Sequence, residues 1–166
     1  MIIQVIISDN YLECKCKKRM NKGLSVDIEK CSGCRMCELV CAFNKEKRVV
    51  PDLARITVWQ NYSQGISTPV FCTHCDNAPC IEICPTKALS KDSVTGIVNV
   101  NEKTCKACRL CAKACKTGAI SFNAKKKKIY KCNLCDGDPI CVKFCPTGAL
   151  TYTKVINISN NKRYNV

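Results

Sequence analysis

The sequence predicts an α+β fold of short helices and β-hairpins, assembled from a repeated cysteine-rich unit. Two observations support this prediction. Of the 18 cysteines in the 166-residue chain, 16 fall into four groups of similar spacing, and similar residues follow the last cysteine of three groups. Self-similarity of this kind indicates a supersecondary unit that recurs along the chain. Each unit is expected to contain a loop, a short helix and a strand.

The predicted strands begin before the first cysteine group. Residues 20–27 favour one strand there, and the alternating residues 55–60 favour a second, followed by a turn at 63–65. Trp59 lies in the longest stretch without cysteine, residues 43–71, which is assigned to packing between modules. We expect Trp59 to be a core or interface residue, and the core is favoured.

A hairpin is predicted between the second and third cysteine groups. Residues 88–90 and 96–100 are strand-like and flank a polar turn at 91–93. The segments that follow the last cysteine of the second, third and fourth groups are Pro-Thr-Lys-Ala-Leu, Lys-Thr-Gly-Ala-Ile and Pro-Thr-Gly-Ala-Leu. Each is typical of a helix end, a turn and the start of a strand.

The four groups share one cysteine pattern. Every group opens with Cys-x-x-Cys and closes with x-x-x-Cys, while the middle gap is two, four, two and five residues. The groups are Cys31, Cys34, Cys37 and Cys41; Cys72, Cys75, Cys80 and Cys84; Cys105, Cys108, Cys111 and Cys115; and Cys132, Cys135, Cys141 and Cys145. Cys14 and Cys16 have no group of matching spacing, and we expect free thiols there, in an N-terminal extension of residues 1–19.

Cysteine at this density serves disulfides, zinc or iron-sulfur clusters. Disulfides require an oxidising compartment, and the apolar opening, residues 1–7, is too short for an export signal and carries no positive charge. No run approaches the roughly 18 apolar residues of a membrane span. We therefore expect a reducing, cytoplasmic setting, no direct membrane span, and cysteines that ligate metal.

The metal is expected to be iron in 4Fe-4S clusters, with zinc as the alternative. Cys-x-x-Cys also occurs in zinc ribbons, and multiples of four ligands suit both metals. The tails Cys84-Pro85 and Cys145-Pro146, repeated together with the Thr-x-Ala segment, favour iron-sulfur loops. Four complete groups predict four clusters. A zinc-stabilised interaction or nucleic-acid-binding module remains the alternative, and metal analysis separates the two.

The charge and the remaining polar residues do not indicate another activity. The formal net charge is +14, and four clusters with their thiolates, at about −2 each, would bring it to roughly +6. The run Lys125-Lys126-Lys127-Lys128 lacks interleaved aromatic residues, so we expect a solvated turn or a docking site for an acidic partner, and no nucleic acid. His74 is expected to face solvent, with a hydrogen bond near the second-group cluster as the alternative. No catalytic constellation occurs, so the chemistry is assigned to a partner.

The stretch CSGCRMCELVC at 31–41, followed by CTHCDNAPCIEICP at 72–85, resembles the four-cluster ferredoxin subunits of molybdenum and tungsten oxidoreductases. That family includes the small subunits of dimethyl sulfoxide reductase and formate dehydrogenase, the electron carrier of carbon monoxide dehydrogenase, and the polyferredoxin of tungsten aldehyde oxidoreductases. The resemblance covers residues 24–152. Within the family, the chain looks most like the carbon monoxide dehydrogenase carrier and the aldehyde oxidoreductase polyferredoxin. It implies a non-catalytic electron-transfer subunit of a cytoplasmic complex. The implied partners are a large catalytic subunit, either a tungsten or molybdenum pterin enzyme or carbon monoxide dehydrogenase, and a soluble or membrane-bound electron acceptor.

In bacterial ferredoxins the fourth cysteine of a group ligates the other cluster of a two-cluster fold. If that holds here, the hairpin-linked second and third groups form one module and the first and fourth groups form the other, and the resemblance implies the same pairing. The predicted ligand sets are Cys31, Cys34 and Cys37 with Cys145; Cys132, Cys135 and Cys141 with Cys41; Cys72, Cys75 and Cys80 with Cys115; and Cys105, Cys108 and Cys111 with Cys84.

This pairing predicts two interleaved bacterial-ferredoxin-like modules. The expected divisions are an N-terminal extension at 1–19, a first module at 20–50 and 125–152, a connector at 51–65, a second module at 66–124 and a C-terminal tail at 153–166.

Overall fold

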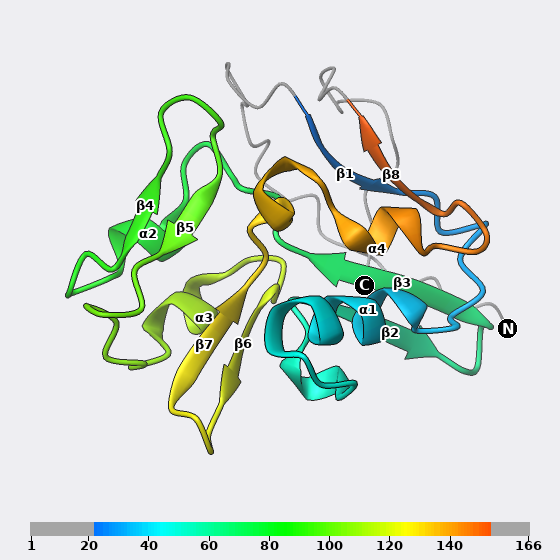
Figure 1. Ribbon diagram of the computed structural model, residues 1–166, viewed down its shortest axis with the longest axis horizontal. Helices are drawn as coiled ribbons and strands as arrows, with labels where there is room; N and C mark the ends of the chain where they lie inside the picture. Colours follow the sequence, from blue (N-terminus) through cyan, green and yellow to red (C-terminus); the bar gives the residue numbers. More distant parts are fainter. Residues whose placement is uncertain (1–21, 154–166) are drawn as a thin grey trace, which may run out of the picture.

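The computed structural model describes residues 22–153 as a small mixed fold of short helices and antiparallel strand pairs (Figure 1). Cys14, Cys16 and the predicted extension lie outside the described residues, as do residues 154–166 of the predicted tail. Within the described range, no helix is long and apolar enough to cross a membrane.

The strands form four two-stranded antiparallel sheets within residues 22–153. The pairs are β1 (Gly23–Val26) with β8 (Leu150–Thr153), β2 (Ile56–Asn61) with β3 (Ile66–Phe71), β4 (Leu89–Lys91) with β5 (Val98–Val100), and β6 (Ile120–Asn123) with β7 (Lys128–Lys131). The strand before the first cysteine, the strand at β2 and the hairpin β4–β5 confirm the sequence predictions. The first and last strands pair with each other, which brings the two ends of the described chain together (Figure 1).

Each α-helix begins immediately before the third cysteine of a group. The helices are α1 (Met36–Glu46), α2 (Pro79–Glu82), α3 (Leu110–Ala114) and α4 (Ile140–Lys143), and short 3₁₀ turns occur at η1 (Pro51–Leu53) and η2 (Leu134–Gly137). Arg35 and Arg109 adopt left-handed backbone conformations just before α1 and α3. The third cysteine therefore occupies the second position of each of these four helices, and the cysteine loop before it ends at the helix start.

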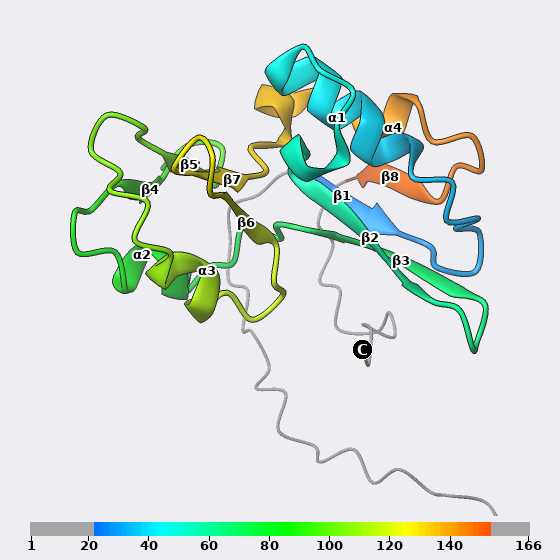
Figure 2. The ribbon, with the colours of Figure 1, turned by 90° about the horizontal axis from the view of Figure 1, so that it is seen from below.

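Two groups of buried side chains stabilise the fold. The first contains Leu53, Phe71, Tyr130 and Leu150 with neighbouring cysteines, and lies where α1 packs beside α4. The second contains Leu89, Val98, Ile120 and Ile129, near α2 and α3. Figures 1 and 2 show these as two lobes, one with α1 and α4 and the other with α2 and α3. Strand β7 contributes Ile129 to one group and Tyr130 to the other, so it joins the two lobes.

The stretch between the first and second cysteine groups differs from the expectation in one respect. Ile56 and Val58 point into the core, so Trp59, the residue after Val58, lies on the outer side of β2 and is 43% exposed. The preferred assignment of Trp59 to the core was therefore wrong. The boundary expected between residues 65 and 66 falls just before β3, which pairs with β2, and that at 124–125 falls between the paired strands β6 and β7.

Candidate metal centres

The sixteen cysteines of the four groups are free thiols. They lie in the loops before the helices, inside the helices, and directly after them, so each group is spread around one helix start. The lobes then bring together cysteines from different groups, and three observations show which ones meet.

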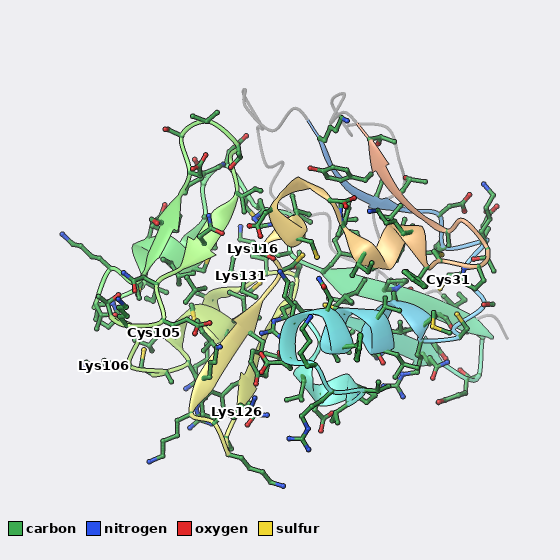
Figure 3. All side chains as sticks on the ribbon, in the orientation of Figure 1. Cys31, Cys105, Lys106, Lys116, Lys126 and Lys131 are labelled. Carbon is green, nitrogen blue, oxygen red and sulfur yellow. The ribbon has the colours of Figure 1, made fainter. Side chains whose placement is uncertain are left out.

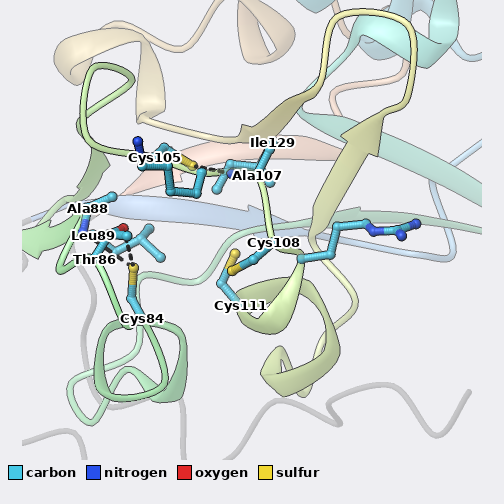
Figure 4. Close-up of a pocket in the computed structure, with 11 residues that line it drawn as sticks. Cys84, Thr86, Ala88, Leu89, Cys105, Ala107, Cys108, Cys111 and Ile129 are labelled. Atoms are coloured by element: carbon cyan, nitrogen blue, oxygen red, sulfur yellow. Dashed lines mark hydrogen bonds between the residues drawn. The ribbon is translucent and has the colours of Figure 1, made fainter.

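One cavity collects four sulfur-bearing side chains from the second and third groups. Its lining includes Cys84, Cys105, Cys108 and Cys111, together with Ala88. Figure 4 shows Cys84 arriving from the segment after α2, while Cys108 and Cys111 arrive from the loop and start of α3. The fourth cysteine of one group therefore shares a cavity with the first three cysteines of the next.

A second cavity joins the opposite ends of the chain. Its lining includes Cys31, Cys34, Cys37 and Cys145, and Val58 and Pro69 of the β2–β3 hairpin form part of its wall. The pairing of β1 with β8 and of α1 with α4 explains this meeting of the first and fourth groups.

Electrostatic effects on the pKa of Cys80 and of Cys141 connect the remaining eight cysteines in two further sets. Burial raises the pKa of Cys80 to about 11, Lys131 opposes this rise, and the nearby thiols of Cys72, Cys115 and Cys75 add to it.

Cys141 belongs to the second of these sets. Burial raises the pKa of Cys141, and the neighbouring Cys132, Cys41, Cys135 and Cys37 raise it further. Negatively charged thiolates raise one another's pKa only at close range, so these four cysteines lie near Cys141.

A left-handed residue follows two positions after the first cysteine of every group. These residues are Gly33, His74, Ala107 and Leu134, with φ between 50° and 68°. The backbone N–H groups of the last three donate to the sulfurs of Cys72, Cys105 and Cys132, each at 3.4 Å. Such N–H groups offset negative charge on sulfur, and the strained backbone conformation is retained because it aims them there.

The fourth cysteines of the second, third and fourth groups lie within hydrogen-bond distance of the repeated segment that follows them. The hydroxyls of Thr86, Thr117 and Thr147 lie 3.7, 3.4 and 3.7 Å from the sulfurs two residues earlier. The backbone N–H of Ala88 also donates to Cys84 at 3.3 Å. Burial raises the pKa of the Cys84 thiol, but these hydrogen bonds outweigh it and the pKa is lowered. This role of the threonine was not predicted from the sequence, although the repetition of threonine two residues after the fourth cysteine was a usable signal.

His74 is buried, so the expectation that it faces solvent was wrong. Its side chain is 3% exposed, and Nδ1 accepts a hydrogen bond from the backbone N–H of Val98 at 3.0 Å. Burial, followed by the charges of Lys131 and Lys91, lowers its pKa to about 3. Nε2 has no partner among the described residues.

These surroundings fit iron-sulfur clusters. Four thiols converge in each cavity, thiolate is the ligand that such clusters use, and N–H and hydroxyl donors already point at the sulfurs. In the part of the chain that the structure describes, no group of three or more His, Cys, Asp or Glu side chains is arranged to hold a single metal ion.

Comparison with known proteins points to the same cofactor. The family model of the 4Fe-4S dicluster domain matches residues 64–155. The polyferredoxin-like subunit of aliphatic sulfonate oxidoreductase from Pyrococcus furiosus is 41% identical over 111 residues, which are 67% of this chain and 64% of that protein. Formate hydrogenlyase subunit 2 of Escherichia coli is 36% identical over 64% of this chain and 51% of its own length. The chain thus matches less than two thirds of either relative.

A third relative and a solved structure extend the comparison. The electron transport protein HydN of Escherichia coli is 33% identical over 70% of this chain and 77% of its own length. The structure of the active site complex BamBC of benzoyl coenzyme A reductase contains a chain with 27% identity and a TM-score of 0.50, covering 82% of this chain and 81% of that one. The family model spans more than half of the sequence and its match includes the second, third and fourth cysteine groups, so this chain belongs to the family of 4Fe-4S dicluster domains.

Proposed function

We propose that this chain carries electrons through four 4Fe-4S clusters in a row, as the non-catalytic iron-sulfur subunit of a cytoplasmic redox enzyme complex. The observation that carries the proposal is that four cysteines from two different groups line each of two cavities. A 4Fe-4S cluster supplies one-electron chemistry when it is bound. The chain supplies the thiolates, the hydrogen bonds to them and the apolar surroundings.

The proposed ligand sets follow the two cavities and the two groups of interacting thiols. The outer sets are Cys31, Cys34, Cys37 and Cys145, and Cys84, Cys105, Cys108 and Cys111. The inner sets are Cys41, Cys132, Cys135 and Cys141, and Cys72, Cys75, Cys80 and Cys115. In this arrangement every fourth cysteine crosses to the other cluster of its module, and the two modules interleave along the chain.

The order of the sets supports a linear path for electrons. Cys37 of one outer set lies near Cys141 of an inner set, and Cys132 of that inner set lies near Cys72 of the other. The outer sets include the exposed Cys34 and Cys108, and Figure 3 labels Cys31 and Cys105 on opposite sides of the molecule. An electron would therefore enter beside one exposed cysteine and leave beside the other.

The partner is proposed to be a large catalytic subunit. Two of the relatives named above are subunits, one of an aliphatic sulfonate oxidoreductase and one of a formate hydrogenlyase. A tungsten or molybdenum pterin enzyme, or carbon monoxide dehydrogenase, would exchange electrons at one outer site, and a soluble or membrane-bound acceptor at the other. An affinity-tagged chain, expressed in its own host, should copurify with a subunit holding a pterin-bound metal or a nickel-iron centre. Recovery of a stable chain without such a subunit would contradict the partner.

Metal analysis tests the cofactor separately. Protein purified without oxygen should contain about 16 iron atoms and about 16 acid-labile sulfides per chain. Its visible absorbance should bleach with dithionite, and reduced samples should give EPR signals of interacting clusters. Zinc in place of iron, or about 8 iron atoms, would contradict the four-cluster proposal.

A further inference from the structure

Lys131 is a buried lysine at the end of β7, directly before Cys132. It is 8% exposed, and Nζ donates to the carbonyl oxygens of Val98 at 2.7 Å and Cys132 at 3.3 Å. Nζ also lies 3.4 Å from Nδ1 of His74. Lysine is rarely buried without a compensating charge, so a negatively charged group is expected near the ammonium group of Lys131.

No carboxylate of the described residues balances it. The ion pairs of residues 22–153 involve other lysines and arginines, and within that range the polar partners of Lys131 Nζ are two carbonyl oxygens and an imidazole nitrogen. The groups near it that would carry negative charge, once they ligate a cluster, are cysteine sulfurs. Lys131 is close enough to Cys80 to oppose the effect of burial on that thiol, and it adjoins Cys132 in the chain.

The imidazole ring of His74 lies beside the ammonium group of Lys131. Because Nδ1 accepts from the Val98 N–H, the ring proton of the neutral imidazole is on Nε2. Nε2 is buried and lacks an acceptor among the described residues. His74 lies between Cys72 and Cys75, so sulfur is the acceptor chemistry nearest in the chain. The ring therefore receives bonds at Nδ1 and offers its proton at Nε2.

The pair lies where the two inner sets face each other. His74 belongs to the loop of Cys72 and Cys75, whereas Lys131 adjoins Cys132, and Cys72 is near enough to Cys132 to raise its pKa further beyond the effect of burial. Figure 3 labels Lys131 in the middle of the molecule, between Cys31 and Cys105. Lys131 thus lies beside a cysteine of each inner set, because it adjoins Cys132 in the chain and its charge opposes the rise in the pKa of Cys80.

We propose that Lys131 is a fixed positive charge shared by the two inner sets, which raises the reduction potentials of both inner clusters, and that His74 positions it. This inference rests on the proposed four-cluster function. An added electron makes a cluster more negative, so a nearby positive charge stabilises the reduced form. Because Lys131 is buried, salt in the solvent screens this effect only weakly. The inner clusters are thereby easier to reduce than they would be beside a neutral residue.

The experiment is an EPR-monitored redox titration of anaerobic protein, preceded by iron analysis. In Lys131→Met, two of the four couples should shift to lower potential and two should stay unchanged. The expected shift is about tenfold in the ratio of reduced to oxidised cluster at a fixed potential, which is about 59 mV for a one-electron couple. Lys131→Arg keeps the charge and should restore the wild-type potentials. His74→Phe should move the same two couples in the same direction by a smaller amount.

Lys125→Met is the matched control, because Lys125 is an exposed lysine in the turn of the same hairpin. It removes the same charge, and its potentials should match the wild type, whereas the Lys131→Met shift should persist in 1 M salt. If Lys131→Met loses iron, Lys131→Gln takes its place, because its amide can still donate to the Val98 carbonyl.

Three outcomes would overturn the proposal. The first is four full clusters with unshifted couples in Lys131→Met. The second is an equal shift in all four couples, and the third is loss of iron from both neutral variants with retention in Lys131→Arg, which would assign Lys131 to cluster assembly. Wild-type protein without about 16 iron atoms would instead contradict the proposed function itself.

Discussion

The carboxylate of Glu38 accepts a hydrogen bond from the backbone N–H of Val58 at 2.5 Å, and so ties helix α1 to strand β2. Glu38 is 1% exposed, and its other oxygen accepts from Nε of Arg35 at 2.7 Å. Glu38 follows Cys37 directly, and Val58 lines the cavity that Cys37 shares with Cys145. This contact therefore fixes one wall of an outer cluster site.

Glu38→Ala should destabilise the protein, because it leaves the Val58 N–H buried without a partner. The expected loss is about 1–3 kcal/mol, measured as a lower urea midpoint of anaerobic, cluster-loaded protein. Glu102→Ala is the control: its side chain is 65% exposed and forms a surface ion pair with Lys128. That change should cost less than about 1 kcal/mol. Equal urea midpoints for the two variants would show that the buried Glu38 contact stabilises the protein no more than the surface ion pair does.

Gly33→Ala should disturb the loop of the first cysteine group. A Cβ at Gly33 would clash with Oγ of Ser67 and would lie 2.8 Å from Nε2 of Gln60, and the φ of Gly33 is +68°. The added strain and overpacking should cost about 2–4 kcal/mol and release iron from one site.

Gly65→Ala separates the steric part of that effect from the backbone part. Gly65 has a φ of +67°, but nothing lies within 4 Å of its Cβ position. We expect a loss of about 1–2 kcal/mol and no loss of iron. Iron content and the urea midpoint report both variants, and retention of all iron by Gly33→Ala would contradict the predicted clash.

Local patterns in the sequence predict the strands and hairpins well. Alternation at residues 55–60 predicts β2, and the polar turn at 91–93 predicts the hairpin β4–β5, because these structures depend on neighbouring residues. The N–H groups that point at sulfur also follow from the local spacing of each cysteine loop.

Burial of single polar or aromatic side chains was predicted less well. His74 looks like a polar loop residue, but it is covered by Val98 and Lys131, which are 24 and 57 residues away in the chain. Such long-range contacts leave no mark in the local sequence. Trp59 is a different case, because the alternation of Ile56 and Val58 with their neighbours already indicated that position 59 faces outward.

Glu46 should make stability depend on pH in the acidic range. Its carboxylate accepts hydrogen bonds from Arg55 at 2.5 Å and Lys126 at 2.7 Å. Burial raises the pKa of Glu46, but these two cations outweigh it and lower the pKa from 4.5 to about 2. The folded state therefore binds this proton less readily than the unfolded state. The contribution of Glu46 is complete above about pH 4.5 and is lost as the pH falls toward about 2.

Glu46→Gln should flatten this dependence. Between pH 5 and pH 3 the wild type should lose about 1–2 kcal/mol more than the variant, read from urea midpoints of cluster-loaded protein. Acid attacks the clusters of both proteins equally, so the difference between them reports Glu46. Glu29→Gln, at an exposed position, should follow the wild type. Parallel curves for the wild type and Glu46→Gln would contradict the role assigned to the contacts with Arg55 and Lys126.

The sharing of cysteines between groups can be tested with two matched double variants. Cys84 lines one cavity with Cys108, although it follows Cys80 in the same group. If the fourth cysteine crosses to the other cluster, Cys84→Ala with Cys108→Ala removes two ligands of one cluster and should leave about 12 iron atoms, as each single variant does. Cys80→Ala with Cys84→Ala removes one ligand from each of two clusters and should leave about 8. Because both variants lose two thiols, the comparison cancels a general effect of lost cysteine. If each group held its own cluster the two results would exchange places, and equal iron content in both would also contradict the sharing.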